Sequence, residues 1–339
     1  MTRAMLMNVT RSNALPRPTT QSGMTLIELM VALAIGMFLM IGAMTVFMQS
    51  RTTFKVTESI SRLQENARFA LEALESDVRM AQYWGFVSRG ELILGRRDPT
   101  QPPGIGPATC GQNWTINLNQ AVQGTNNSYG WACAGQAPVE VNSDTLVVRH
   151  VGDDLVTPPN LAGQLAVVTS RYNGTVFNTA AIPGGYDVAG GFAQVHRLMV
   201  NGYYVRRAAG TVPPALRRKT LQTDGTIGDE EVMSGVEDLQ VQFGIDTDPP
   251  GAANRGSVDR YVNPDNPIID PTNAAFDPNV EILAVRVWLR IRAERPENGF
   301  VDQTNYVYAD QNVPAIGDSF RRVLVSKTIY LRNTRPPDY

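Results

Sequence analysis

A predominantly apolar run covers residues 24–48 and is interrupted by a single acid, Glu28. As an α-helix, about 25 residues reach ~37 Å, which exceeds the ~30 Å hydrocarbon core of a bilayer. We therefore predict that this run forms a helix that can span a membrane. A carboxylate inside such a span is costly, so it marks a functional position that needs a partner.

Two other interpretations of an N-terminal apolar run are a secretory signal peptide and a plain membrane anchor. The apolar region of a signal peptide is about 7–15 residues long and ends at a cleavage site of small residues. The run found here is longer and contains an acid, which leaves the plain anchor as the alternative. Residues 1–23 contain three arginines and no acid, so the positive-inside rule places them in the cytoplasm and exports the rest.

The stretch Gly23-Met24-Thr25-Leu26-Ile27-Glu28 resembles the processing site of type IV prepilins and of the related type II secretion pseudopilins. In that family a prepilin peptidase cuts after the glycine, the new N-terminus is methylated, and a glutamate is fifth in the mature chain. The resemblance implies cleavage after Gly23, methylation of Met24 and a docking role for Glu28. Met24 and Glu28 are four residues apart, so the new amine and the carboxylate can be neighbours on one helix face. In a bundle of such helices, Glu28 could equally meet the terminal amine of a subunit already in place.

The helical pattern continues beyond the apolar run. Apolar residues recur at three- and four-residue steps through residues 54–81, which indicates an amphipathic helix with one buried stripe. The stripe consists of Phe54, Val56, Ile60, Leu63, Ala67, Ala70, Leu74, Val78 and Ala81. No proline occurs in residues 24–83, so we predict one helix of about 60 residues.

Later runs alternate between apolar and other residues or are rich in β-branched and aromatic residues, as is typical of antiparallel strands. The runs are residues 145–151, 165–169, 198–205, 239–245, 285–291 and 323–331. Two stretches rich in turn-forming residues, 99–143 and 246–279, are predicted to be large loop insertions. The sequence thus predicts an α+β fold, in its pilin-like form, with the long helix packed on antiparallel sheet.

The two cysteines, Cys110 and Cys133, both fall in the exported part of the chain. An oxidising compartment favours a disulfide between them, which would stabilise the fold by about 3 kcal/mol; two free thiols are the alternative. A zinc site is not expected, because His150 and His196 have no ligand-type residues at suitable spacing.

Acidic residues gather in the second insertion, where carboxylate oxygens can hold calcium. We name Asp246, Asp248 and Asp259 as the calcium candidates. Aspartate beside proline and glycine also forms turns that need no ion. The prediction is therefore that the protein has no metal and no cofactor.

A basic cluster of Arg217, Arg218 and Lys219, with Arg206 and Arg207 upstream, could contact the phosphates of DNA. Without residues 1–23 the chain keeps 27 basic and 32 acidic residues, so we interpret the cluster as solvated strand ends and expect no nucleic-acid partner. No nucleophile elbow, zinc-protease or phosphate-loop motif occurs, so no enzymatic activity is predicted.

Downstream segments extend the resemblance. Residues 63–68, 235–244, 285–287 and 331–333 together resemble the PilW group of minor pilins. This resemblance implies a structural subunit of a type IV pilus, placed in the tip complex that primes assembly for twitching motility and adhesion. Its partners would be the major pilin, other minor pilins, the prepilin peptidase and the inner membrane. Three alternatives stay open: a type II secretion pseudopilin, a DNA-uptake subunit and a membrane-anchored enzyme.

The expected organisation has four parts. They are a cleaved cytoplasmic leader at 1–23, a membrane or filament-core helix at 24–48, an amphipathic helix at 49–84 and a periplasmic β-rich domain at 85–339. The chain would cross the inner membrane once, with its N-terminus in the cytoplasm, before assembly into the extracellular pilus.

Overall fold

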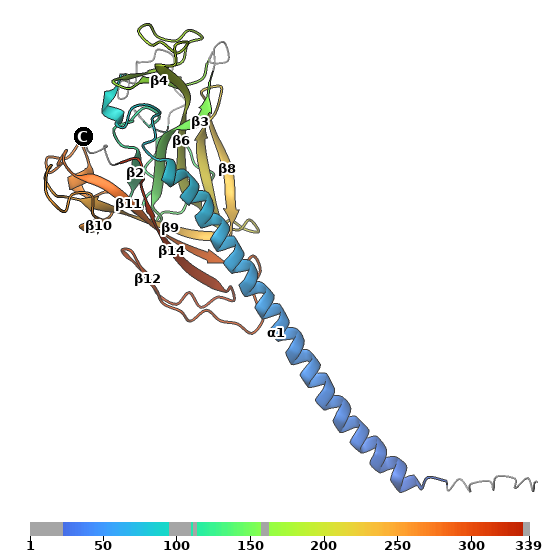
Figure 1. The fold of residues 1–339 in the computed structure, drawn as a ribbon. Coiled ribbons are helices and arrows are strands. Elements are labelled where there is room, and N and C mark those ends of the chain that lie inside the picture. The colour runs from blue at the N-terminus through green and yellow to red at the C-terminus, as the bar shows by residue number, and fades with distance from the viewer. Residues whose placement is uncertain (1–22, 95–109, 111–113, 157–162, 335–339) are drawn as a thin grey trace, which may run out of the picture. The chain divides into compact units, whose positions relative to one another are not determined.

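The computed structural model describes residues 23–94, 110, 114–156 and 163–334, so the leader up to residue 22 and part of the first insertion lie outside the described residues. The chain divides into two compact units, Met1–Thr57 and Glu58–Tyr339. Helix α1, Leu26–Met80, is continuous across this boundary and is 55 residues long. It is followed by sheets that are almost entirely antiparallel, so the predicted α+β class is confirmed (Figure 1).

Within the second unit, α1 buries one stripe of its surface. The buried apolar members are Leu63, Ala67, Ala70, Leu74 and Val78, and Ala81, directly after the helix, is buried as well. The prediction is wrong for two earlier members, since Phe54 is 70% exposed and Ile60 is 38% exposed. Periodicity identifies the apolar face of a helix, whereas burial also needs a covering layer, and that layer begins at Leu63.

The large sheet has β6, Ala193–Arg206, at its centre. One edge of β6 pairs with β3, and the other edge pairs with β4 along its first half and with β7 along its second. The remaining strands extend the sheet outward, and every pair is antiparallel except β1 with β5. The other members are β1 (Ile93–Leu94), β2 (Val122–Thr125), β3 (Thr145–Leu155), β4 (Ala166–Ser170), β5 (Gly174–Phe177), β7 (Ala215–Leu221) and β8 (Ile227–Ser234).

The small sheet is entirely antiparallel and runs in the order β10, β9, β11, β14. Its strands are β9 (Val236–Asp246), β10 (Arg260–Val262), β11 (Glu281–Arg292) and β14 (Arg322–Tyr330). A separate hairpin is formed by β12 (Tyr306–Tyr308) and β13 (Gln311–Val313). In β11, Val285, Val287 and Leu289 are fully buried while the residues between them are partly exposed, which confirms the predicted alternation.

All six predicted runs are strands, but the sequence-based prediction missed others. Strands β7 and β8 escaped it because charged residues interrupt their apolar alternation. Strands β2 and β10 lie inside the two stretches predicted to be loops, so that prediction is wrong there. Both pair along one edge, and an edge position is where proline-rich segments tolerate a short strand.

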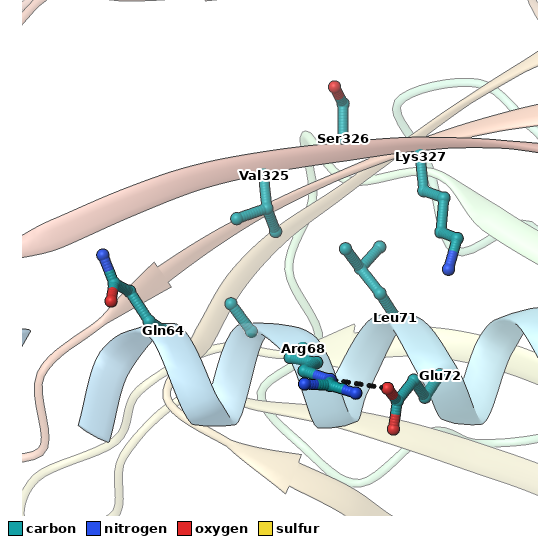
Figure 2. A pocket seen from close by; sticks show the side chains of 8 residues that line it. Gln64, Arg68, Leu71, Glu72, Val325, Ser326 and Lys327 are labelled. Atoms are coloured by element: carbon teal, nitrogen blue, oxygen red, sulfur yellow. Dashed lines mark hydrogen bonds and ion pairs between the residues drawn. The ribbon is translucent and has the colours of Figure 1, made fainter. Parts of the chain in front are cut away.

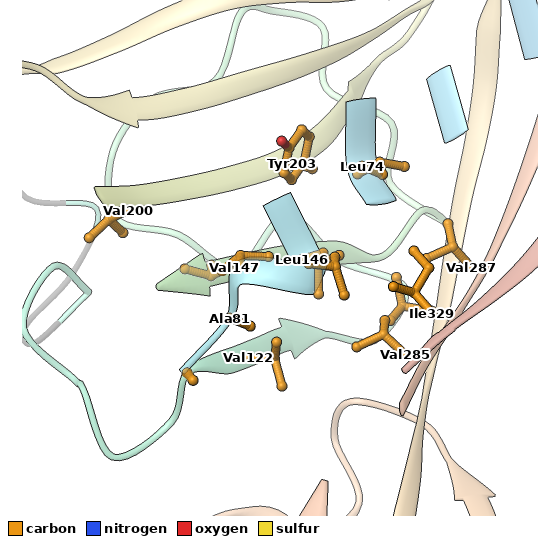
Figure 3. Close-up of a cluster of buried hydrophobic side chains, with 14 of the residues drawn as sticks. Leu74, Ala81, Val122, Leu146, Val147, Val200, Tyr203, Val285, Val287 and Ile329 are labelled. Carbon is orange, nitrogen blue, oxygen red and sulfur yellow. The ribbon is translucent and has the colours of Figure 1, made fainter. Parts of the chain in front are cut away.

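One apolar core joins α1 to both sheets (Figure 3). Leu74 of the helix lies among Leu146 and Tyr203 of the large sheet and Val287 of the small sheet, all of them fully buried. Full burial of side chains of this size contributes about 1.5–3 kcal/mol each. The core therefore holds the helix between two layers rather than against one.

Asp144, directly before β3, connects the large sheet to the small one. Its backbone N–H donates to the carbonyl of Leu239 and its carboxylate accepts from the N–H of Val241, both at 2.8 Å. These groups lie on the edge of β9 beyond the reach of the short β10. Burial raises the pKa of Asp144 to about 7.

Beside this core, α1 and β14 leave an open groove of about 520 Å³ (Figure 2). Val325 and Lys327 point from β14 toward the helix, whereas Ser326 points away from it. Leu71 faces Val325 across the groove, and Lys327 pairs with Glu75 of the helix. The odd-numbered side chains of β14 thus face α1, and the even-numbered ones form the opposite, outer face of the small sheet.

A buried carboxylate fixes α1 on the large sheet. Asp77 is 8% exposed and accepts hydrogen bonds from His150 Nε2 at 2.9 Å, Asn201 Nδ2 at 2.9 Å and the Tyr203 hydroxyl at 3.1 Å. We call these four residues the Asp77 cluster. Its three donors come from β3 and β6, so the cluster connects the helix to the two central strands of the sheet.

The hydrogen bonds of His150 define its protonation. Its Nδ1 lies 2.9 Å from the carbonyl oxygen of Val151, which can only accept, so Nδ1 carries a proton. Its Nε2 faces the Asp77 carboxylate, so the pair shares a second proton and is best described as imidazolium and carboxylate. Burial lowers the pKa of His150, but the hydrogen bonds and the charge of Asp77 outweigh it and raise the pKa above its ordinary value.

The end of α1 is held by a residue far along the chain. The side-chain amide of Asn333 donates toward the carbonyl oxygens of Arg79, Met80 and Ala81, at 3.1–3.5 Å. The last carbonyls of a helix have no intrahelical partner, so this amide supplies one. Asn333 belongs to the closing segment, 331–333, whose sequence resembles that of PilW-type pilins.

The Asp77–His150 pair predicts a pH-dependent stability with a defined sign. The folded pKa of His150 is raised, so the contribution of the pair is complete below the unfolded pKa and is lost as pH rises through the folded one. Urea unfolding of the detergent-solubilised protein from about pH 5.5 to 9 measures this loss. His150→Gln should lower the free energy of unfolding by about 3–5 kcal/mol at the lowest pH of this range. It should also remove the part of the pH dependence that comes from the Asp77–His150 pair.

Asp77→Asn is the matched variant, because the amide keeps one acceptor for the donors of the cluster but cannot pair with imidazolium. Asp77→Asn should also remove the fall in the free energy of unfolding that the ion pair causes as pH rises. If the unfolding free energies of the wild type and His150→Gln fall in parallel as pH rises, the ion pair is not the source of the dependence.

Candidate processing and assembly site

The segment predicted to be processed lies at the start of α1. Gly23, Met24 and Thr25 are exposed and precede the helix, which begins at Leu26. Apart from its chain neighbours, no atom of the described residues lies within 4 Å of where a Cβ on Gly23 would be. The bond between Gly23 and Met24 therefore lies before the helix, at exposed residues.

Glu28 has a local partner in the uncut chain. Its Oε2 accepts hydrogen bonds from the backbone N–H and the hydroxyl of Thr25, both at 2.9 Å. The Thr25 hydroxyl lies 3.4 Å from the N–H of Glu28, which completes the reciprocal pattern of a capping box. An acid in the first turn also interacts favourably with the helix dipole. Glu28 thus has a structural role at the helix start besides the docking role that the resemblance implies.

The helix that follows this segment exposes its apolar side chains on all faces. Its most apolar stretch of 18 residues has a mean hydropathy of 2.4, and none of it is buried. By length and composition this is a helix that can cross a membrane. The exposed large side chains from Leu26 to Met48 fit lipid or neighbouring apolar helices rather than water.

Cys110 and Cys133 form a disulfide, with an S–S distance of 2.01 Å, as the sequence predicted. It lies beside an aromatic cluster in which Trp131 contacts both Trp114 and Tyr204, with ring centroids 5.9 Å apart in each pair. These rings lie against Gly202 of β6, where a Cβ would come within 2.7 Å of Trp131. The glycine lets the cross-linked loop pack directly on the central strand.

Removing the disulfide should destabilise the domain. Replacing both Cys110 and Cys133 by serine is expected to lower the free energy of unfolding by about 3 kcal/mol. A reductant should shift the wild type by a similar amount and leave the double variant unchanged, as measured by urea unfolding in detergent. Equal stability of the oxidised and reduced wild type would contradict a stabilising role.

The three calcium candidates do come together in space. Oxygens of Asp246, Asp248 and Asp259 lie within 4.8 Å of one another. The carboxylate of Asp246 accepts from the backbone N–H groups of Asp248 and Gly256, and that of Asp259 accepts from the N–H and hydroxyl of Thr247. These are turn hydrogen bonds, so the arrangement carries no metal assignment.

The basic cluster is paired within the protein. Asp229 of β8 lies 2.8 Å from Arg217 and 2.9 Å from Lys219. Arg218 pairs with Glu230, the neighbour of Asp229. Further upstream, Arg206 pairs with Glu231, whereas Arg207 is exposed. Most of these cations therefore form a ladder across β7 and β8 and are not the solvated strand ends that the sequence suggested.

The histidines are both engaged in structural hydrogen bonds, His150 in the Asp77 cluster and His196 with the carbonyl of Gly152 at 2.8 Å. The Asp77 cluster was missed by the sequence reasoning. A signal existed, because Asp77 falls on the same helix face as Leu74, Val78 and Ala81, where a polar residue requires a partner.

Two protein-family models match the chain. Residues 202–333 match the family described as type IV pilus-assembly protein W, and residues 18–44 match the prokaryotic N-terminal methylation motif. No curated protein sequence matches the chain. Among solved structures, a type IV-like pilin from Thermus thermophilus is similar at 14% identity and a TM-score of 0.27, with 57% of this chain and 79% of that chain covered.

The methylation motif and the PilW match, on a chain with one long apolar N-terminal helix before antiparallel sheets, define a type IV pilin-like protein. Within that class the chain carries a PilW region at residues 202–333, in agreement with the resemblance found in its sequence. Its PilW region begins at the end of β6 and includes the whole small sheet and Asn333. The roles of Gly23, Met24 and Glu28 remain predictions.

Proposed function

We propose that the protein is a minor subunit of a type IV pilus, cut after Gly23, methylated at Met24 and incorporated in the tip complex that primes pilus assembly. The observation that carries the proposal is the exposed segment Gly23–Glu28 at the start of an exposed apolar helix, inside the matched methylation motif. Such a subunit contributes to twitching motility and adhesion through the pilus and performs no catalysis of its own.

The proposed topology follows from the charges around the helix. Residues 1–23 carry three arginines and no acid, so they stay in the cytoplasm while the unit beyond the helix is periplasmic. The oxidising periplasm agrees with the disulfide between Cys110 and Cys133. The chain is then stored in the inner membrane until it meets the major pilin and other minor pilins.

A type II secretion pseudopilin would share the leader and the helix. The match to a pilus-assembly family supports the pilus. A DNA-uptake role is less well supported, because acids of β8 pair with most of the basic cluster and leave few cations for phosphates. Loss of pili, with protein secretion unchanged, in a strain lacking this subunit would decide for the pilus.

Processing gives the first test of the proposal. Mass spectrometry of the mature protein should find an N-terminus at Met24 that carries one added methyl group. Gly23→Val should block cleavage, because the peptidase site accepts glycine, and the uncut chain should run as a larger band. A mature N-terminus at any other residue contradicts the proposal.

Glu28 gives the second test, and two variants separate its two roles. Glu28→Gln keeps an oxygen that can accept from Thr25 but removes the charge, whereas Glu28→Ala removes both. If Glu28 docks onto the N-terminal amine of another subunit, both variants should insert in the membrane and both should be depleted from sheared pili. Normal incorporation of Glu28→Gln would leave Glu28 with the capping role alone.

A further inference from the structure

The outer face of the small sheet carries four arginines, and one of them differs from the rest. Glu237 lies within 2.7–3.6 Å of Arg290, Arg292 and Arg322. Arg286 shares this face, yet no carboxylate pairs with it among the described residues. It is therefore a cation that the rest of the sheet leaves without a counterion.

Arg286 is nevertheless held in a fixed orientation. Its guanidinium carbon lies 3.5 Å from the ring centroid of Tyr261, and its Nε donates to the Thr328 hydroxyl at 3.2 Å. Trp288, the next residue on the same face, has its ring 5.8 Å from this guanidinium carbon. The stacking and the Nε bond fix the plane of the guanidinium. Neither Nη group makes a hydrogen bond within the described residues, so both remain available to a ligand.

The local sequence explains how the tyrosine reaches Arg286. Tyr261 of β10 pairs with Gly244 of β9, and a Cβ on Gly244 would lie 3.0 Å from the tyrosine ring. The small side chain of Ala284 occupies the next position across the sheet. The glycine and the alanine thus leave room for the ring to extend across β9 toward Arg286.

We infer that Arg286, Tyr261, Trp288 and Tyr330 form a docking surface for an acidic segment of a different pilin subunit. We call these four residues the Arg286 surface. A planar guanidinium with free Nη groups binds a carboxylate through two parallel hydrogen bonds. Tryptophan, tyrosine and arginine are also the residues that dominate binding energy at protein interfaces. Tyr330 is 63% exposed and lies two residues beyond Thr328, the cross-strand partner of Arg286, so it is placed to enlarge the contact.

The choice of partner follows from the charge of the surface. A single unpaired cation suits one carboxylate, whereas nucleic acids bind through several phosphate contacts. The inference rests on the proposed function, because the partners of a pilus subunit are other pilus subunits. It goes beyond that function by naming the face of the protein and the side chain that recognise the neighbour.

Arg286→Lys turns the docking arginine into a chemical probe. A carbodiimide joins a lysine amine only to a carboxylate in direct contact, so pilus-bearing cells of this variant should yield a new cross-linked product. Mass spectrometry should find the introduced amine bound to an aspartate or glutamate of another pilin subunit. Arg207→Lys, which introduces the same amine on an exposed residue directly after β6, is the matched control and should yield none.

The identity of the product decides the inference. A product that joins two copies of this chain, a link to an acid of the same chain, or no product at all would each overturn it. A link to another pilin subunit that also forms with Arg207→Lys would be unspecific and would overturn it as well.

Charge reversal tests the same contact by its effect on assembly. Arg286→Glu should lower the amount of this subunit in sheared pili at least about tenfold, which corresponds to ~1.4 kcal/mol. Arg207→Glu makes the same change in net charge and should leave the amount unchanged. Urea unfolding of the detergent-solubilised variants checks folding, and if Arg286→Glu does not fold, the cross-link of Arg286→Lys decides alone. Normal incorporation of folded Arg286→Glu contradicts the inference.

These results separate the inference from the proposed function. A wild-type chain that is not cut after Gly23 or is absent from pili refutes the proposed function. A wild-type chain that is processed and present in pili, with no specific cross-link from Arg286→Lys, refutes the Arg286 surface alone.

Discussion

The buried hydrogen bonds of Asp77 are the interaction on which the rest of the domain depends. An apolar stripe such as Leu63 to Val78 can pack on a sheet in more than one register, because dispersion and burial have no direction. Three donors from β3 and β6 bind the single carboxylate of Asp77, and all three bonds form in only one position of the helix. With the helix fixed, Leu74 fills the space between the two sheets and the last turn meets Asn333.

One helix serves two environments in this protein. From Leu26 to Met48 its large apolar side chains are exposed, as lipid or a helical bundle requires, whereas from Leu63 onward one stripe is buried by protein. Charged pairs such as Glu58 with Arg62 occupy the solvated face of the second part. The hydrogen bonds that hold the processing segment next to Gly23 are therefore local to the start of the helix and involve no residue of the sheets.

Much of this architecture could be predicted from the sequence, because periodicity identifies the apolar face of each helix and strand. The long helix and the strands around Val241, Val287 and Val325 follow from their apolar spacing. Strands β7 and β8 could not be found this way, since the stability of Arg217 and Lys219 within a strand comes from acids on the neighbouring strand. The Arg286 surface was equally hidden, because it depends on a tyrosine of β10 that only the folded sheet brings near. Periodicity predicts which face is buried but not which polar groups meet across strands.

The contact between Asn333 and the end of α1 has a consequence for biogenesis. During synthesis the helix is made first, while the amide that completes its last turn is added more than 250 residues later. A product truncated before β14 would retain the apolar helix but lack both its terminal cap and the lysine that pairs with Glu75. Such fragments would keep frayed, protease-sensitive helix ends, so the fold itself distinguishes finished subunits from incomplete ones.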